Sequence, residues 1–359
     1  MLLSLFCGAG GLDLGFERVG FEVGLAFDRN CDSVFSYNEN RPNSRVGHVA
    51  DLSTMTLRTL DRKAGKLFTP TGIIGGPPCQ SFSQANVRQT DDDPRHVMPL
   101  VFARLTRRLN DRSPVDFFVF ENVVGLTLAR HRETLRRTKA MFDRAGFEVT
   151  QAILDAQFYG APQSRRRLFL VGFNRNRFGD LKWVPPEQQQ TPVATVRDAI
   201  EGLPEPRFFE RNADADSFPH HPNHWCMQPK SPKFGRPGAL DEGNVKSRSF
   251  KTLSWDRPSI AVAYGHREVH IHPSGTRRLS VYEAMQLQGM PHEYRLHGNL
   301  SSQIRQVSEA VPFPLAKAVA QSVSDQLAAA DKSGRVIQVH RPDWEVSQPL
   351  APKRDVIVR

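Results

Sequence analysis

The sequence predicts an α/β fold in which helices cover a mostly parallel sheet. Between residues 2 and 173, short apolar segments alternate with stretches of helical periodicity, as in successive βαβ units. A proline-rich stretch without periodicity, at residues 174–276, interrupts this pattern, and helical periodicity resumes after it. We therefore expect one domain built from residues 1–173 and 277–330, with a smaller domain inserted between them.

Apolar segments bounded by turn residues are expected to form the strands of this sheet. Each is short and mainly apolar, as buried parallel strands are. They are Leu2–Phe6, Glu22–Ala26, Gly72–Ile74, Asp116–Phe120, Phe147–Leu154 and Leu168–Phe173.

Helices are expected where apolar residues recur every three or four positions, because that spacing places them on one helix face. These core-facing positions are Leu12, Gly15, Phe16 and Val19; Val101, Leu105 and Leu109; Val281, Ala284, Met285 and Gln288; and Leu315, Ala318, Val319, Ser322, Val323 and Leu327. Residues 331–359 are polar and basic with scattered prolines, which predicts a poorly ordered tail.

Composition narrows the class of protein. The chain has 359 residues, a net charge of +10 and a sequence pI near 9.7, which suits a polyanion such as nucleic acid, although solubility alone would also explain the charge. Its segments are too short for membrane spans, and the first residues lack a basic start and a cleavage site. The four cysteines form no disulfide framework. We expect a reduced, cytoplasmic protein associated with the nucleoid.

The first strand runs into a turn that contains Gly8, Gly10 and Gly11. Glycines there let the backbone approach a ligand closely, although a tight strand-to-helix turn needs glycine in any case. Asp28 follows the second strand, where folds of this kind bind a ribose. Asp13 stands where the dinucleotide fingerprint has its last glycine, which favours an adenosine cofactor other than NAD.

The segment Gly75-Gly76-Pro77-Pro78-Cys79 predicts an exposed, reactive thiol at the carboxyl end of a strand. A free thiol has a pKa of about 8.5 and needs an activating environment to attack a substrate. For Cys7, Cys31 and Cys226 we expect the ordinary role of a small apolar residue.

Two further sets of polar residues are expected near the carboxyl ends of the strands. Glu121 and Asn122 close a buried strand, and a carboxyl there can give a proton to a ring nitrogen, although a lone glutamate is often a surface or capping acid. Gln163, Arg165 and Arg167 alternate along an extended segment and should therefore point the same way. Arginines at that spacing can bind a carbonyl or phosphate, whereas Arg166 is expected in solvent.

These motifs, in this order, resemble the DNA (cytosine-5) methyltransferase family of bacterial type. FCGAGG is similar to its S-adenosylmethionine loop, GGPPCQSFS to its nucleophile loop, and ENV, QSRRR and RRLSVYEAMQLQGMP to three later motifs. The resemblance implies a Rossmann-like methyltransferase fold with an inserted target recognition domain. It also implies methyl transfer from S-adenosylmethionine to carbon 5 of a cytosine flipped out of a short duplex site.

The resemblance also implies roles for individual residues. Cys79 would add to carbon 6 of the base, Glu121 would support ring nitrogen 3, and Arg165 and Arg167 would hold the base carbonyl and the loop. The implied cofactor residues are Phe6, Gly8, Gly10, Gly11, Asp28, Asp51, Leu52, Pro78, Glu309 and Ala310. The implied base and DNA residues are Pro78, Gln80, Ser83, Asn122, Gln163 and Thr252, with a mobile loop from Gln80 to Pro99.

One departure from the family leaves the preferred donor open. Ser308 and Glu309 stand where the family has glycine and asparagine, and a carboxylate there would attract the sulfonium or change the preferred donor. An inactive DNA-binding homologue, a tRNA methyltransferase and a nucleotide-dependent oxidoreductase are three rival hypotheses for the function. The histidines near Cys226 suggest zinc, but without a second ligand pair we expect no metal. Duplex DNA is the expected partner of a monomer, with a companion restriction endonuclease left open.

Overall fold

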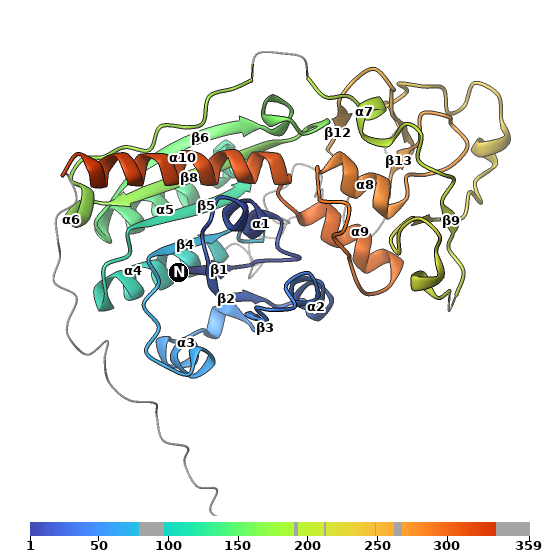
Figure 1. The fold of residues 1–359 in the computed structure, drawn as a ribbon. Helices are drawn as coiled ribbons and strands as arrows, with labels where there is room; N and C mark the ends of the chain where they lie inside the picture. Colours follow the sequence, from blue (N-terminus) through green and yellow to red (C-terminus); the bar gives the residue numbers. More distant parts are fainter. Residues whose placement is uncertain (79–96, 190–192, 212, 248, 262–267, 335–359) are drawn as a thin grey trace, which may run out of the picture.

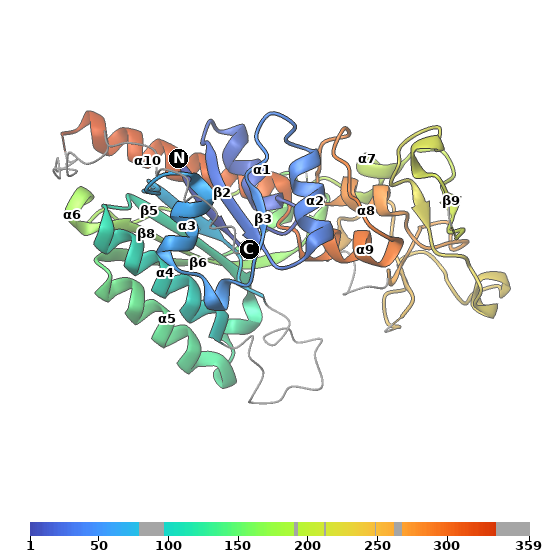
Figure 2. The same ribbon diagram turned by 90° about the horizontal axis from the view of Figure 1, so that it is seen from below.

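The computed structural model describes residues 1–78, 97–189, 193–211, 213–247, 249–261 and 268–334. A seven-stranded sheet lies between two layers of helices, and a smaller, loop-rich part adjoins one end of it (Figures 1 and 2). The strand order is β3-β2-β1-β4-β5-β8-β6. Strand β8 runs antiparallel to both β5 and β6, and the remaining pairings in this sheet are parallel.

The observed strands match the predicted segments closely, because continuous apolar runs suit strands buried on both faces. They are β1 (Leu2–Leu5), β2 (Val23–Asp28), β3 (Gly47–Val49), β4 (Gly72–Gly75), β5 (Phe117–Val123), β6 (Phe147–Asp155) and β8 (Arg166–Asn174). Strand β3 was not predicted, since its three residues lie in a polar, turn-rich stretch with no apolar run of its own.

Helices cover both faces of the sheet. One layer contains α1 (Gly11–Arg18), α2 (Cys31–Glu39) and α10 (Phe313–Lys332), and the other contains α3 (Leu57–Ala64), α4 (Met98–Arg112) and α5 (Arg132–Arg144). Met98 and Pro99 were predicted to belong to a mobile loop, but they form the first turn of α4, where proline is well tolerated. The predicted tail begins inside α10, and residues 335–359 lie outside the described chain.

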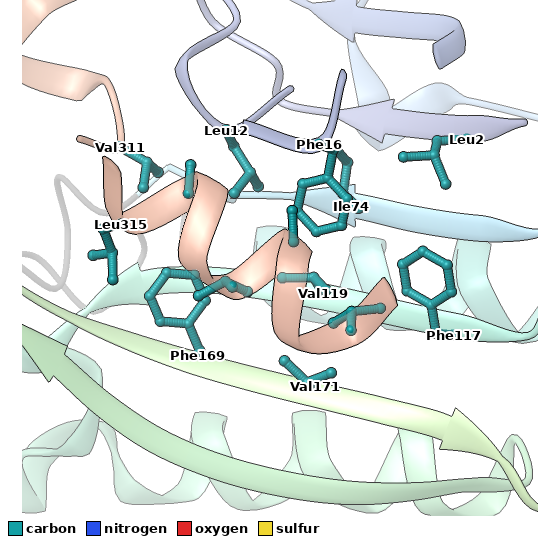
Figure 3. Packing of buried hydrophobic residues seen from close by; sticks show 14 of the residues in the cluster. Leu2, Leu12, Phe16, Ile74, Phe117, Val119, Phe169, Val171, Val311 and Leu315 are labelled. Atoms are coloured by element: carbon teal, nitrogen blue, oxygen red, sulfur yellow. The ribbon is translucent and has the colours of Figure 1, made fainter. Parts of the chain in front are cut away.

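Side chains of β5 alternate between two hydrophobic clusters. Phe117 and Val119 face α1 and α10, as Figure 3 shows, whereas Phe118 and Phe120 pack toward α4 and α5. Within their layer, α10 and α1 lie very close together. A Cβ added to Gly15 of α1 would lie 2.5 Å from the backbone of Ala316 in α10. This alternation confirms the predicted sheet between two helical layers.

A third hydrophobic cluster forms the core of the smaller part. It joins α7 (Val196–Ile200) and Trp225 of the insertion to α8 (Val281–Leu287) and α9 (Leu300–Glu309). The other short elements are α6 (Arg175–Phe178) and the strand pairs β7 (Gln163–Ser164) with β12 (Ser259–Ile260), β9 (Arg207–Phe208) with β10 (Trp225–Cys226), and β11 (Lys251–Thr252) with β13 (His270–Ile271). Thus α8 and α9 share their core with the insertion, while α10 packs on the sheet.

A buried ion pair explains the start of the sequence motif RRLSVYE. Two nitrogens of the Arg277 guanidinium each lie 2.9 Å from a carboxylate oxygen of Glu283. Glu283 is fully buried and also accepts a hydrogen bond from the backbone N–H of Ser280, which caps α8. Because the partners lie six residues apart at the helix start, they fix the entry of the chain into α8.

Replacing Glu283 with alanine is expected to lower the free energy of unfolding by about 3–5 kcal/mol, because it leaves the Arg277 charge buried without this partner. Urea denaturation of the two proteins measures the loss. The control is Glu205→Ala, which removes the second carboxylate that Arg277 contacts, at 2.7 Å. The Glu205 side chain is 77% exposed, so its loss is expected to cost less than about 1 kcal/mol. Equal effects of the two substitutions would contradict this account.

No described helix is long and apolar enough to cross a membrane.

Candidate active site

The carboxyl ends of the parallel strands β1, β2, β4 and β5 lie at one edge of the sheet, beside the smaller part (Figure 1). The carboxyl ends of parallel strands are where α/β folds bind their ligands. The cofactor and catalytic residues that the sequence predicts between Phe6 and Asn122 lie at this edge, as far as the structure describes them. Cys79, Gln80 and Ser83 lie outside the described residues.

The turn after β1 has an unusual backbone. Phe6, Gly8 and Gly10 all have positive φ angles, of 58°, 54° and 89°. Asp28, at the end of β2, holds this turn by accepting a hydrogen bond from the backbone N–H of Gly8 at 3.0 Å. A Cβ added to Gly8 would meet no atom within 4 Å, so open space adjoins the turn. A glycine turn beside open space, with an acid at its side, fits an adenosine cofactor.

Asp28, the acid beside this turn, is half-buried. Burial raises the pKa of Asp28, against hydrogen bonds from the backbone of Asn30 and Gly8 that lower it. The residue that follows β3 is bonded to the backbone of Asp28. The backbone N–H of Ala50 donates to the backbone carbonyl oxygen of Asp28 at 2.8 Å. Asp51 and Leu52 follow directly: Leu52 is buried, and Asp51 is exposed with its pKa lowered by hydrogen bonds from Ser53. These residues therefore lie beside Asp28.

The turn between α9 and α10 closes another side of the glycine turn. A Cβ on Gly11 would lie 3.2 Å from the Ala310 Cβ and 2.9 Å from the Val311 carbonyl oxygen. Glu309, the last residue of α9, is exposed next to Ala310. The departure from the family pattern thus lies next to the segment that packs on the start of α1.

Glu121 is buried at the end of β5 and pairs with Arg167. The Glu121 carboxylate lies 2.9 Å from Arg167 Nε, and these side chains are only 10% and 13% exposed. Gly76 makes room for the pair, since a Cβ there would lie 2.5 Å from Glu121 Oε2. Burial raises the pKa of Glu121, although Arg167 and Arg165 lower it. This carboxyl can therefore hold a proton at a higher pH than an exposed glutamate.

Asn122 fixes the start of the Cys79 loop. Its side-chain N–H donates to the Pro77 carbonyl oxygen at 3.1 Å, and this hydrogen bond is buried. Pro78, half-buried, is the last described residue before Cys79. The chain therefore leaves Pro78 next to the strand end that carries Glu121.

Burial alternates along the segment that carries Gln163, Arg165 and Arg167. Gln163 and Arg165 are buried and Arg166 is exposed. Arg165 Nη2 donates to the carbonyl oxygens of Ser308 and Ala310, and Gln163 Nε2 donates to that of Leu287 at 3.2 Å. The interaction of Arg165 with the turn at 308–310 was not foreseen, because residues 143 and 145 positions apart leave no periodic signal in the sequence.

The insertion contributes less to this edge. Thr252 lies on β11 and is fully buried, and no described hydrogen bond joins it to the strand ends. The histidines near Cys226 pack within the smaller part: His221 stacks on Tyr282, and His224 contacts Ser280 Oγ at 3.0 Å. Burial raises the pKa of Cys226 to about 12. Among the residues that the structure describes, no group of three or more histidine, cysteine or acidic side chains could hold a metal.

The sequence singled out Asp13 only because it replaces a glycine of the dinucleotide fingerprint. Asp13 lies buried on α1 below the glycine turn, and the Tyr37 hydroxyl donates to it at 3.1 Å. Burial raises the pKa of Asp13 to about 6, although Arg41 lowers it.

The Asp13→Asn variant is expected to become more stable relative to the wild type as the pH rises from about 4 to about 6. The Asp13 carboxyl binds its proton more tightly in the folded protein than in the unfolded chain, so folding becomes less favourable as this proton is lost. Asparagine has no such proton to lose and still accepts the Tyr37 hydrogen bond. Chemical denaturation of both proteins across this range measures the difference, and a constant difference would contradict the assignment.

Comparisons with known proteins place this chain among its relatives. A family model described as C-5 cytosine-specific DNA methylase matches residues 1–325. Type II methyltransferase M.NmeDI of Neisseria meningitidis serogroup C is 30% identical over 360 residues, covering 91% of this chain and 84% of that protein. Type II methyltransferase M.MthTI of Methanothermobacter thermautotrophicus is 31% identical over 353 residues, covering 91% and 97%.

Solved structures share the fold. A putative DNA modification methyltransferase encoded within an Escherichia coli prophage superposes with a TM-score of 0.74 at 23% identity, covering 91% of this chain and 99% of that one. The Dnmt2 methyltransferase of S. pombe superposes with a TM-score of 0.61 at 18% identity, covering 92% and 99%.

Proposed function

Because the chain belongs to the C-5 cytosine-specific DNA methylase family, we propose that it methylates carbon 5 of a cytosine flipped out of a short duplex site. It is a cytosine-5 DNA methyltransferase whose donor is S-adenosylmethionine. The observation that carries the proposed mechanism is the buried pair of Glu121 and Arg167 beside the Pro77-Pro78 segment that leads to Cys79. The insertion, residues 174–276, is proposed as the target recognition domain.

The residues around the glycine turn fit the cofactor. The positive φ angles and the open space at Gly8 suit a close approach of the methionine part, and the Asp28 carboxylate suits the ribose hydroxyls. Asp51 and Leu52 are proposed beside the adenine, with Phe6, Gly10, Gly11, Pro78, Glu309 and Ala310 completing the pocket. When bound, S-adenosylmethionine supplies a methyl group activated by its sulfonium charge.

The proposed mechanism begins with the base outside the helix, since carbons 5 and 6 are covered in stacked DNA. The Cys79 thiolate adds to carbon 6 while Glu121 holds a proton at ring nitrogen 3, and the electrons displaced from the ring double bond make carbon 5 nucleophilic. After methylation, loss of the proton on carbon 5 and of the thiolate restores the aromatic ring. Covalent addition thus divides one difficult step into easier ones.

Two arginines support this chemistry in different ways. Arg167 pairs with Glu121, and we propose that it holds that carboxyl toward the base. Arg165 holds the carbonyls of Ser308 and Ala310, so we assign it to positioning the turn that packs on Gly11. The base contacts proposed for Pro78, Gln80, Ser83, Asn122, Gln163 and Thr252 remain predictions, as do the monomeric state and a companion restriction endonuclease.

The direct experiment incubates the purified protein with unmodified duplex DNA and S-adenosylmethionine and analyses the nucleosides by mass spectrometry. We expect 5-methylcytosine in the duplex and none in tRNA incubated in parallel. Methylation of the tRNA alone would show that the substrate is RNA and would contradict the proposed DNA substrate. Absence of product on both, with normal binding of cofactor and DNA, would support an inactive DNA-binding protein.

The Glu309 position bears on the choice between ordinary S-adenosylmethionine and a modified alkyl donor. A carboxylate next to the cofactor segment attracts the positive sulfonium and repels a donor that carries an additional carboxylate. Ordinary S-adenosylmethionine is therefore the preferred donor. The mass of the alkyl group on cytosine, compared between the wild type and Glu309→Asn, tests this, because a product other than methylcytosine would establish a different donor.

A further inference from the structure

A buried cluster of charged and aromatic residues lies below the glycine turn and takes no part in the chemistry proposed above. At its centre is Arg41, just beyond α2, with a side chain that is only 8% exposed. Its Nε and Nη2 each donate to a different carboxylate oxygen of Glu17 on α1, both at 2.7 Å. The guanidinium also stacks on the Tyr37 ring, 3.8 Å from the ring centroid. Arg41 is therefore held from several sides.

The guanidinium lies directly against the glycine turn. A Cβ added to Gly10 would lie 2.9 Å from both Nη1 and Nη2 of Arg41. Arg41 Nη1 also donates to the Tyr294 hydroxyl at 3.3 Å, and that hydroxyl in turn donates to the Ala9 carbonyl oxygen. A continuous chain of contacts thus runs from Glu17 through Arg41 and Tyr294 to the backbone of the turn.

The segment that carries Tyr294 is fixed independently of Arg41. The Asn40 side chain exchanges two hydrogen bonds with the backbone of Arg295, at 2.7 and 2.8 Å. Ser36 accepts a hydrogen bond from the His297 backbone N–H at 2.8 Å. Helix α2 begins just after Asp28 and ends just before Arg41, so one helix connects the proposed ribose acid to the support of the glycine turn.

The energetics argue for a positioning role. The ion pair of Arg41 with the half-buried Glu17 is expected to contribute little net stability, because the loss of hydration of the buried guanidinium offsets the attraction between the charges. The turn that it supports has positive φ angles at Phe6, Gly8 and Gly10, a backbone that the surrounding structure must hold in place. The rigid guanidinium of Arg41, which binds Glu17 through two nitrogens and lies against Gly10, supplies that constraint.

We infer that Arg41 and Tyr294 are positioning residues for S-adenosylmethionine, holding the turn from Gly8 to Gly11 in its cofactor-binding conformation. Neither residue is assigned to the reaction itself. The inference rests on the proposed function, because it takes S-adenosylmethionine as the ligand of this turn.

The test measures the affinity of the full chain for S-adenosylmethionine by isothermal titration calorimetry, without DNA or turnover. Tyr294→Phe removes one hydroxyl and keeps the ring, and we expect the Kd to rise about tenfold, the effect of losing one to two buried hydrogen bonds. Arg41→Lys keeps the positive charge but lacks the planar guanidinium, so it should also weaken the binding of S-adenosylmethionine. The matched control is Tyr159→Phe, whose hydroxyl likewise donates to a backbone carbonyl, that of Pro186, at 3.1 Å.

Thermal melting of the same variants separates positioning from general stability. A raised Kd in Tyr294→Phe, with a melting temperature like that of Tyr159→Phe, would support the inference. An unchanged Kd in both Tyr294→Phe and Arg41→Lys would overturn it, whatever the melting temperature. If the wild type itself failed to bind S-adenosylmethionine, the proposed function would fail together with this inference, whereas normal wild-type binding with unaffected variants would overturn this inference alone.

Discussion

The Cys79→Ala variant is expected to lose methyl transfer by at least about 10⁴-fold while binding S-adenosylmethionine as the wild type does. Without the thiol, nothing adds to carbon 6, and carbon 5 of cytosine stays too weak a nucleophile to accept a methyl group. The cofactor affinity should be unchanged because the thiol is assigned to the base, and most of the proposed cofactor residues follow other strands, β1, β2 and β3. Nucleoside mass spectrometry and calorimetry measure the two quantities.

Cys31→Ala is the control for this experiment, because Cys31 is an exposed free cysteine at the start of α2. It should methylate DNA at the wild-type rate. Normal turnover by Cys79→Ala would exclude the covalent mechanism, and a large loss in both variants would point to a general requirement for thiols instead.

The Glu121→Gln variant is expected to lower the turnover number by about 10²- to 10⁴-fold, the usual contribution of a general acid. Glutamine keeps the size of the side chain and an oxygen for Arg167, but it cannot give a proton to ring nitrogen 3. Burial raises the pKa of Glu121, so the protonated form persists to a higher pH than in an exposed glutamate. The wild-type rate should therefore fall as the pH rises above that pKa, and this dependence should vanish in Glu121→Gln.

Steady-state kinetics across a range of pH measure both effects. Glu133→Gln serves as the control, since Glu133 also pairs with an arginine, Arg136 at 2.8 Å, but is exposed on α5. Its rate and its pH dependence should match those of the wild type. If Glu121→Gln kept the alkaline decline of the wild type, the titrating group would have to be another residue.

Much of the fold could be predicted from the sequence because its signals are local. The stripe of Val101, Leu105 and Leu109 predicts a helix face, and these residues are buried on α4. The apolar run that begins at Asp116 predicts a strand, and β5 extends from Phe117 to Val123, so that it includes Glu121 and Asn122. Each prediction depends only on neighbouring residues and on burial.

Other features depend on residues far apart in the chain. Strand β8 lies antiparallel between β5 and β6, an arrangement that the apolar pattern of a strand does not encode. The sharing of a core by α8, α9 and the insertion depends on which apolar faces meet, and any amphipathic helix offers such a face.

The sequence by itself determined six strands of the sheet, several helix faces and the motif residues at the strand ends, because periodicity and short motifs act over a few positions. Only the tertiary structure decided what those residues contact: Arg167 binds Glu121, Arg165 holds the turn at Ser308, and Arg41 meets Tyr294, 253 positions away. Hydrogen bonds and ion pairs require distances of a few ångströms, and for residues so far apart in the chain those distances exist only once the sheet and its helices have packed.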